Sequence, residues 1–433
     1  MAASDAAAAA AVSRAARRLI PFLFVCYVVS YLDRVNLGFA ASAFQRDLAM
    51  SDRVYGIGAG LFFLGYFVFE IPSNLILERV GARRWLARIM ITWGIVSVAM
   101  MFAVGTWSFY ALRIALGLAE AGFFPGAVLY LTYWFPQRER GRLGALFMAA
   151  GPVALIVGPY LSTVLLRLDG LGGLRGWQWL FIGEGLPAVV LGVMALRWLT
   201  DRPADAQWLP EAERAALVAQ IAAEQESRSG GERHLALMGS MKSARVWLLC
   251  VVYFLNTTVS YGLFLWLPKI LEAASGWHDM RLAAISACPF VIALATMVII
   301  GRHSDRTGER KWHLAWSALG AAGGLVLAAT AGTNVALLVL AFTICQAGQR
   351  TVQPLFWTLP PLLLGGTAAA AGFALINSVG NLGGFAGPTV MGYLRETTGG
   401  YAGGLLVLAA ALVIQAAIVV ALRLPAVAEP QRQ

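Results

Sequence analysis

The feature of this sequence that most constrains its fold is a succession of long apolar runs separated by short polar breaks. A helix needs about 20 apolar residues to cross the core of a lipid bilayer. We predict twelve membrane spans, at residues 19–42, 54–77, 85–104, 108–132, 143–166, 177–199, 246–271, 281–300, 312–331, 335–363, 369–394 and 402–423. Each should be an α-helix, because lipid offers no partner for unpaired backbone groups and the runs are too long for barrel strands.

Composition supports a membrane setting and excludes other classes of protein. The chain is 59% hydrophobic and 13% charged, whereas soluble domains carry about 25% charged residues. The net charge of +10 would suit a nucleic-acid partner, but the basic residues cluster at the ends of the apolar runs. We therefore expect the lipid bilayer, and no nucleic acid, as the large partner of this chain.

The basic residues also predict the orientation of the chain. Most of the Lys and Arg residues fall in breaks on the same side of the predicted membrane as the N-terminus. Because cytoplasmic loops carry such an excess, both termini should be cytoplasmic. The first apolar run is longer than the hydrophobic part of a signal peptide and contains Asp33 and Arg34, so it should be a retained helix.

One long polar stretch divides the chain. We predict a cytoplasmic tail (1–18), an N-terminal six-helix bundle (19–199), a cytoplasmic linker (200–244), a C-terminal six-helix bundle (245–424) and a second cytoplasmic tail (425–433). The linker should contain one amphipathic helix that begins near Pro210. A binding function of its own is the alternative for this loop.

Short matches recur between the two halves at nearly one offset. They pair Glu78-Arg79-Val-Gly81 with Asp305-Arg306-Thr-Gly308, Glu120-Ala-Gly122 with Gln346-Ala-Gly348, and Gly158-Pro159 with Gly387-Pro388. The offsets of 226 to 229 residues indicate an internal duplication. A duplicated bundle with the substrate site between its repeats is a common plan for secondary transporters.

Residues that would support catalysis or a cofactor are missing from the expected positions. The four cysteines lie in separate apolar runs with no CxxC spacing, which indicates neither a metal site nor a disulfide framework. The four histidines lie in predicted loops or at helix ends. The sequence contains no HExxH, GxSxG or phosphate-binding GxxxxGK[ST] motif. We therefore expect no enzyme activity, no metal and no cofactor.

Several charged residues lie inside the predicted spans, where each costs at least a few kcal/mol and is a functional candidate by default. They are Asp33, Arg34, Glu70, Arg113, Glu120, Glu184 and Arg350. Arg113 and Glu120 are two helical turns apart and share one face of their span. Arg34 and Arg113 are candidate clamps for a carboxylate, because a guanidinium group can donate two parallel hydrogen bonds to it.

Asp33 and Glu120 are the candidate proton carriers. Removal from water favours the protonated form of an acid, whereas a neighbouring arginine favours the ionised form. A carboxylate substrate that occupies the arginine should therefore promote proton uptake, and linkage makes that coupling reciprocal. Static salt bridges between helices are the alternative, and they are the favoured interpretation for Glu70 and Glu184, which lie near predicted helix ends.

Span ten carries a polar stripe at helical spacing. Gln346, Arg350 and Gln353 recur at i, i+4 and i+7, and Trp357 follows one turn later. We predict that Gln346 and Arg350 contact the distal end of the substrate, and that Asn377 and Asn381 do so from span eleven. Hydrogen bonding between helices is the alternative. Tyr31, Tyr66 and Trp357 could orient a hydroxylated or aromatic acid or simply pack in the core.

The loops after spans two and eight share an acid, an arginine, a glycine and further basic residues. We interpret them as a cytoplasmic gate whose ion pairs, Glu78 with Arg79 and Asp305 with Arg306, rearrange during transport. The predicted gate residues are Glu78, Arg79, Gly81, Arg83, Arg84, Gly301, Asp305, Arg306 and Gly308.

Together with the internal repeat, these loops resemble the major facilitator superfamily over essentially the whole chain. The first loop departs from the usual pattern, with Asn74 in place of a glycine and Glu78 in place of an aspartate. Three stretches are similar to the anion:cation symporter branch, most closely to tartrate, hydroxyphenylacetate and phthalate transporters. They are Tyr31-Leu-Asp33-Arg34-Val-Asn36-Leu, Gly117-Leu-Ala-Glu120-Ala-Gly122-Phe-Phe-Pro125-Gly126 continuing to Tyr133-Trp134-Phe135-Pro136, and Gly372-Phe-Ala-Leu-Ile-Asn377-Ser-Val-Gly380-Asn381-Leu-Gly-Gly384.

The resemblance implies an all-α membrane protein with twelve transmembrane helices in two six-helix repeats. It also implies proton-coupled import of a small organic anion, such as tartrate, a sugar acid or a small aromatic acid, by alternating access. Such a protein would be a monomer in the bacterial inner membrane, with protons as the coupling ion. An exporter or exchanger of another small molecule, or a transporter-like sensor, is the alternative.

Overall fold

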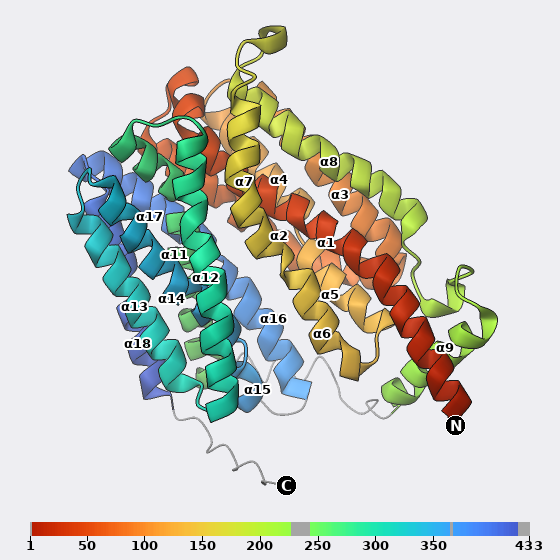
Figure 1. Cartoon of the computed structure of the whole chain (residues 1–433). Coiled ribbons are helices and arrows are strands. Elements are labelled where there is room, and N and C mark those ends of the chain that lie inside the picture. Colours follow the sequence, from red (N-terminus) through yellow and green to blue (C-terminus); the bar gives the residue numbers. More distant parts are fainter. Residues whose placement is uncertain (1, 227–242, 364–366, 423–433) are drawn as a thin grey trace. The chain divides into compact units, whose positions relative to one another are not determined.

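The structure of the chain is a computed structural model that describes residues 2–226, 243–363 and 367–422 (Figure 1). The described residues form helices, short 3-10 turns and connecting loops, and no strand. The predicted tail 425–433 and part of the predicted linker lie outside these ranges. The all-α fold class is confirmed for the described chain.

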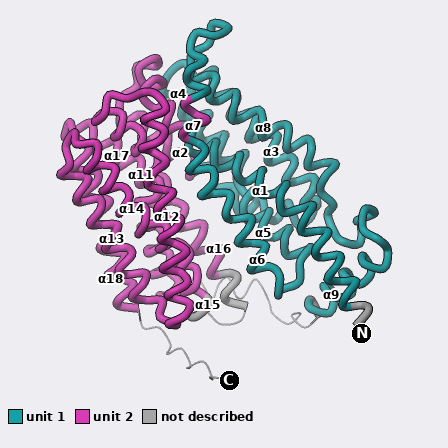
Figure 2. The backbone as a smooth tube through the Cα atoms, viewed as in Figure 1, with its two compact units in different colours: residues 1–36, 64–158, 164–230 teal, residues 37–63, 159–163, 231–433 magenta. Residues whose placement is uncertain are grey.

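The chain forms two compact units, which Figure 2 shows in different colours. Unit 1 comprises residues 1–36, 64–158 and 164–230, and unit 2 comprises residues 37–63, 159–163 and 231–433. The helices that lie wholly or partly in unit 1 are α1 (Ala2–Asp47), α2 (Asp52–Val80), α3 (Ala82–Ala99), α4 (Thr106–Glu120), α5 (Phe123–Trp134), α6 (Gln137–Met148), α7 (Ala150–Leu166), α8 (Gly176–Trp198) and α9 (Glu211–Glu226). Three of them, α1, α2 and α7, also have residues in unit 2. Helices of unit 2 are α11 (Ala244–Ser275), α12 (Met280–Thr307), α13 (Lys311–Thr330), α14 (Val335–Phe356), α15 (Leu359–Leu363), α16 (Thr367–Asn381), α17 (Gly383–Thr398) and α18 (Ala402–Ala421).

Eleven helical segments in the described ranges are long and apolar enough to cross a membrane. Each coincides with a predicted span. The remaining predicted span, 369–394, corresponds to α16 and α17, which have 15 and 16 residues and meet at Leu382. A helix also begins just after Pro210, because α9 starts at Glu211 as predicted.

The first helix is longer than the predicted span. Residues 2–18, expected to be a tail, continue span one without a break, so that α1 has 46 residues. The run of alanines in this segment favours helix, because alanine loses no side-chain entropy there. The extension is also packed, since Ala11 and Ala15 are fully buried.

The compact units are not the predicted bundles, because residues 37–63 group with α11 and α17 in unit 2. Close backbone approach explains this grouping. A Cβ atom at Gly56 would clash with the Pro388 carbonyl oxygen, and one at Gly60 would lie 2.8 Å from the Phe385 carbonyl oxygen. Polar contacts add to it: the Tyr55 hydroxyl lies 3.2 Å from the Leu265 carbonyl oxygen.

An ionic cluster lies where the end of α1 and the start of α2 meet α11 and α17 in unit 2. Asp52 pairs with Lys269, and Asp52 Oδ2 lies 3.7 Å from Arg395 Nε. Gln45 donates to Asp52 Oδ1 at 3.1 Å. These contacts hold the ends of α1 and α2 to α11 and α17 within unit 2.

Span four is broken, whereas its prediction is a continuous helix. Helix α4 ends at Glu120 and α5 begins at Phe123, because Ala121 is extended (ψ 130°) and Gly122 has a φ of +88°. Only glycine takes this left-handed conformation without strain. A Cβ atom at Gly122 would also clash with Ser73 Oγ. The break therefore depends on a glycine, and it lies directly after the intramembrane acid Glu120.

Substituting Gly122 should destabilise the protein more than a glycine in open surroundings. We expect Gly122→Ala to cost about 1–2 kcal/mol from the left-handed conformation alone, with the Ser73 clash in addition. Gly144→Ala, in the interior of α6 with no atom within 4 Å of the added Cβ, should be neutral or stabilising by up to about 1 kcal/mol. Thermal unfolding of the detergent-purified variants measures both, and equal shifts would contradict the account of the break.

Candidate functional site

The side chain of Glu120 is completely buried and accepts hydrogen bonds from two residues of α1. Ser30 Oγ donates to Glu120 Oε1 at 2.8 Å, and Arg34 Nε donates to the same oxygen at 2.8 Å. Arg34 Nη2 also lies 2.7 Å from Glu120 Oε1, which makes an ion pair. Because Ser30 and Arg34 are one helical turn apart, one face of α1 supplies both donors.

Two tyrosines lie beside the guanidinium group of Arg34. Its central carbon is 5.3 Å from the ring centroid of Tyr66 and 5.8 Å from that of Tyr31. Both distances are within the range of a cation–π interaction. The structure thus brings four predicted site residues, Tyr31, Arg34, Tyr66 and Glu120, together in unit 1.

Asp33 forms a second polar centre next to this one and is 1% exposed. Its Oδ1 accepts a hydrogen bond from Ser97 of α3 and another from Asn36 Nδ2 at 3.2 Å. Arg113 of α4, which is also buried, and Glu120 both lie near enough for their charges to act on Asp33. Two acids and two arginines therefore lie close together in unit 1, as the sequence predicts, but Glu120 has its direct ion pair with Arg34.

The predicted polar stripe of span ten lies on α14 in unit 2. Gln346 is 1% exposed, and no described group forms a hydrogen bond with its Oε1. The guanidinium carbon of Arg350 lies 5.6 Å from the ring centroid of Phe290. Gln349, which the sequence analysis did not select, is buried too, and its Nε2 donates to the Asn256 carbonyl oxygen at 2.8 Å and to Ser260 Oγ at 2.7 Å.

The other predicted substrate-binding residues of unit 2 lie on and next to α14 and α16. Trp357, which follows the end of α14, stacks on Phe373 with ring centroids 5.4 Å apart and meets Tyr253 edge-on at 4.9 Å. Asn377 and Asn381 are half-buried on α16. Trp357 therefore has the aromatic packing that a core residue would have, which leaves its contact with substrate a prediction.

The first gate loop has an acidic partner that the sequence analysis missed. Asp201, just after α8, accepts a hydrogen bond from the Arg83 backbone N–H at 2.8 Å, and its carboxylate lies 3.9 Å from Arg83 Nε. A Cβ atom at Gly81, whose φ is +96°, would lie 2.7 Å from Asp201 Oδ1. Glu78, Arg79 and Arg84 are exposed.

The second gate loop pairs its acid differently from the prediction. Asp305 forms its ion pair with Arg310 at 2.6 Å, and not with Arg306, which is exposed. Gly301 is the half-buried glycine in the last turns of α12, and Gly308 ends that helix with a φ of +69°. Partial burial acts to raise the pKa of nearby Glu309, but hydrogen bonds from Trp312 and His313 outweigh it and lower that pKa.

Ser30, Ser97, Gln349 and Asp201 are the functional candidates that the sequence did not reveal. Serines on apolar helices are common and carry no signal of their own. Gln349 could have been found as a polar residue one turn from Gln346, and Asp201 as the first acid after span six. In the described ranges, no three His, Cys, Asp or Glu side chains converge as metal ligands would.

Membrane-spanning helices, an internal repeat and a buried cluster of acids and arginines define the class: a polytopic secondary transporter rather than an enzyme. Residues 23–388 match the model of the Major Facilitator Superfamily. The chain belongs to this family.

Relatives and solved structures agree with this assignment. The chain is 49% identical, over 94% of its length and 93% of the relative's, to a protein of Agrobacterium vitis named "putative tartrate transporter". It is 43% identical, over 90% of its length and 89% of the relative's, to a quinolone resistance transporter of Acinetobacter baumannii. Its fold is similar to that of a bacterial homologue of the human lysosomal transporter Spinster, with a TM-score of 0.77 at 16% identity over 93% of this chain and 96% of that one.

Variants that break the buried ion pair should show how strongly Arg34 and Glu120 are coupled energetically. We expect Arg34→Gln to destabilise the protein by about 3–5 kcal/mol at neutral pH, because it leaves Glu120 buried and unpaired. The loss should shrink as the pH falls, since protonation removes the unpaired charge. The double variant Arg34→Gln/Glu120→Gln should recover most of the stability.

The wild type, both single variants and the double variant form a double-mutant cycle. Thermal unfolding of these four proteins in detergent at two pH values measures it. Arg281→Gln is the control, because that ion pair with Asp279 is largely exposed and should contribute less than about 1 kcal/mol. Additive losses in the double variant would mean that Arg34 and Glu120 are not energetically coupled.

Proposed function

We propose that this protein is a proton-coupled symporter that imports an organic carboxylate, such as tartrate, a sugar acid or a small aromatic acid. The observation that carries the proposal is the buried ion pair between Arg34 and Glu120. It joins a group suited to a carboxylate with a group suited to a proton. The tartrate transporter names of relatives that are 49% and 50% identical support the same substrate class.

The ion pair between Arg34 and Glu120 couples binding of the substrate to binding of the proton, because the substrate competes with Glu120 for Arg34. A substrate carboxylate that binds Arg34 takes over the guanidinium donors that Glu120 holds in the substrate-free protein. Glu120 then lacks a counter-ion in a buried setting and takes up a proton. Ser30 keeps its contact with the carboxyl group in both states, because its hydroxyl can donate to the ionised form and accept from the protonated form.

Asp33 is the second proton carrier in this proposal. Its carboxylate is held by Ser97 and Asn36, and one of its oxygens, Oδ2, has no hydrogen-bond partner among the described residues. Arg113 lies near enough for its charge to act on Asp33. We assign Arg113 to the substrate carboxylate as well, and Gln346, Arg350, Trp357, Asn377 and Asn381 to the rest of the substrate molecule.

Transport would proceed by alternating access, with the two loops of matching sequence after α2 and α12 as a cytoplasmic gate. The gate ion pairs in this proposal are Arg83 with Asp201 and Asp305 with Arg310, both partly accessible to water. We place the protein in a bacterial inner membrane as a monomer, with both termini in the cytoplasm. Protons are the coupling ion, and the transport step needs no cofactor.

An exporter is the second candidate function. The observation in its favour is the 43% identity to a quinolone resistance transporter. The same proton site could drive export in exchange for protons. Direction of transport and chemical class of the substrate therefore have to be measured together.

Glu120→Gln should separate proton coupling from substrate binding. In proteoliposomes with an imposed pH gradient, we expect uptake of the substrate by this variant to fall to the level seen without a gradient. Exchange of internal for external substrate should persist, because it needs no net proton transfer. The wild type should be screened with tartrate, another hydroxy acid, a sugar acid, an aromatic acid and a quinolone.

Glu184→Gln is the matched control, because Glu184 is also a buried acid of a span but is assigned a structural role. It should keep gradient-driven uptake wherever the protein folds. Full gradient-driven uptake by Glu120→Gln would refute the assignment of Glu120. Gradient-driven extrusion of the quinolone, without uptake of any acid, would establish the exporter instead.

A further inference from the structure

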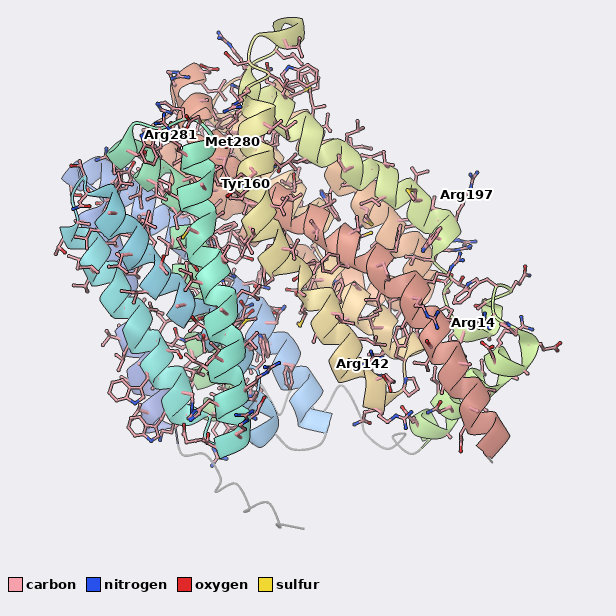
Figure 3. The ribbon with its side chains drawn as sticks, in the orientation of Figure 1. Arg14, Arg142, Tyr160, Arg197, Met280 and Arg281 are labelled. Carbon is pink, nitrogen blue, oxygen red and sulfur yellow. The ribbon has the colours of Figure 1, made fainter. Side chains whose placement is uncertain are left out.

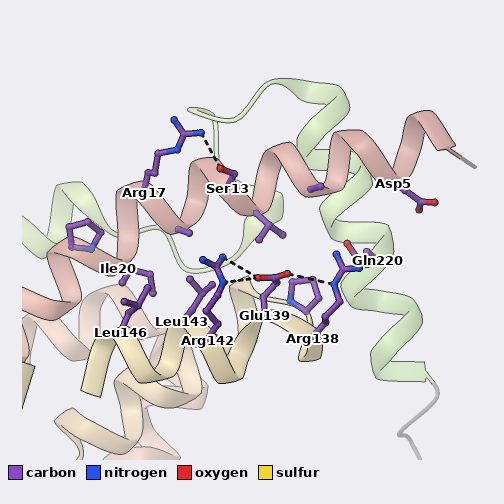
Figure 4. A pocket seen from close by; sticks show the side chains of 15 residues that line it. Asp5, Ser13, Arg17, Ile20, Arg138, Glu139, Arg142, Leu143, Leu146 and Gln220 are labelled. Atoms are coloured by element: carbon purple, nitrogen blue, oxygen red, sulfur yellow. Dashed lines mark hydrogen bonds and ion pairs between the residues drawn. The ribbon is translucent and has the colours of Figure 1, made fainter. Parts of the chain in front are cut away.

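A cavity of about 560 Å³ lies in unit 1 between the N-terminal part of α1, the start of α6 and α9, away from the buried ion pair (Figure 4). Its walls carry Asp5, Ser13 and Arg17 on α1, Arg138, Glu139 and Arg142 on α6, and Gln220 on α9. Its volume is within the range of about 300–1,000 Å³ that is usual for small-molecule sites. The transport mechanism uses none of these residues.

Helix α9, which forms the third wall of the cavity beside α1 and α6, is held in place by ion pairs and hydrogen bonds. Glu213 of α9 lies 3.0 Å from Arg14 of α1, and Glu224 of α9 accepts from the Gln137 backbone N–H at 3.0 Å. Figure 3 labels Arg14 on α1 and Arg142 on α6, and Figure 1, in the same orientation, marks the N-terminus at that end of the teal unit of Figure 2. The linker helix is thus anchored at both ends, and the cavity is bounded by three helices.

Most of the residues that line the cavity lie on α1 and α6. Along both helices these residues change from charged to apolar in the same direction. On α6, Arg138 and Arg142 are followed by Leu143 and by Leu146, which is 50% exposed. On α1, Arg17 is followed by Ile20 and Pro21. The change coincides with the starts of the predicted spans 19–42 and 143–166, so we infer that the charged part of the cavity lies at the level where lipid headgroups begin. An amphiphile fits this arrangement better than a water-soluble metabolite.

The charged side chains favour an anion. Arg138 and Arg142 share the carboxylate of Glu139, at 3.5 Å and 3.1 Å, and are otherwise largely exposed. Arg17 donates to Ser13 Oγ at 3.0 Å. A guanidinium group has five donor hydrogens, so these contacts leave donors for a further acceptor. Three arginines against Asp5 and Glu139 give the lining a net charge of +1.

We propose that this cavity binds the headgroup of an anionic glycerophospholipid, with the phosphodiester on Arg138 and Arg142 and an acyl chain along Leu143 and Leu146. Basic pockets beside the cytoplasmic ends of membrane helices are suited to such headgroups. Arg17 closes the site from α1 when its side chain turns from Ser13 toward the phosphate. The bound lipid would join α1, α6 and the linker helix α9.

Native mass spectrometry of the full-length protein tests the proposal. The detergent-purified protein is mixed with equal amounts of phosphatidylglycerol, phosphatidylethanolamine and phosphatidylcholine that carry the same acyl chains, and the retained lipids are counted. We expect phosphatidylglycerol to be retained preferentially. Arg138→Gln/Arg142→Gln should lower its retention, by roughly fivefold for each arginine removed.

Glu139→Gln should act in the opposite direction. It removes the acid that the two arginines share, so retention of phosphatidylglycerol should rise. A variant that simply disturbs the fold would not increase binding, which keeps the test decisive if the double arginine variant unfolds. Arg281→Gln is the matched control, because Arg281 has the same side-chain exposure of 66% as Arg142 and also pairs with an acid.

Three outcomes would overturn the proposal. Equal retention of the three lipids would show that charge does not select the headgroup. A loss in Arg281→Gln equal to that in the double arginine variant would indicate unspecific attraction to the surface. Displacement of the lipid by millimolar inorganic phosphate would assign the cavity to a free anion.

Leu146→Ser tests the position of the acyl chain. This variant should weaken retention of all three lipids without changing the preference among them. Unchanged retention would show that the acyl chain does not lie along Leu146.

Discussion

The buried ion pair between Arg34 and Glu120 is the interaction on which the rest of the candidate site depends. A charge within the membrane costs several kcal/mol unless it is paired, so each partner makes the other tolerable. Ser30, Tyr31 and Tyr66 surround the pair and add a hydrogen bond and two cation–π contacts. Neither Arg34 nor Glu120 is stable in this buried place without the other charge. A ligand that separates them therefore has to supply a charge that replaces the lost partner.

The break in span four lies directly beside this ion pair. Glu120 is the last residue of α4, where the negative end of the helix dipole disfavours its charge, and it precedes the positive start of α5. Non-helical backbone is tolerated at this depth only where protein covers it, and Ser73 packed against Gly122 provides that cover. The glycine in the Glu-Ala-Gly stretch therefore permits a covered break in the helix directly after the buried acid.

Helical periodicity and hydropathy were sufficient to locate eleven of the twelve predicted spans and the linker helix, and they placed Asp33, Arg34, Arg113 and Glu120 inside spans. They place residues on faces, but they do not say which faces meet. Arg113 and Glu120 share a face as predicted, yet the direct partner of Glu120 lies on α1, 86 residues away in sequence. Asp201 and the residues that group 37–63 with unit 2 were missed for the same reason: their contacts join distant segments, and only packing brings them together.

The two matching stretches of the repeats differ in a property that the proposed proton coupling requires. Glu120-Ala-Gly122 ends a helix beside an ion pair, whereas the matching Gln346-Ala-Gly348 lies in the middle of continuous α14. There Gly348 allows α14 to pack closely on α13, since a Cβ atom would clash with the Ser317 carbonyl oxygen. An amide does not titrate, so a proton site in the first repeat has no counterpart at the matching position of the second. In the proposed mechanism, proton coupling therefore rests on Glu120 of the first repeat, and the amide of Gln346 in the second repeat can only donate and accept hydrogen bonds.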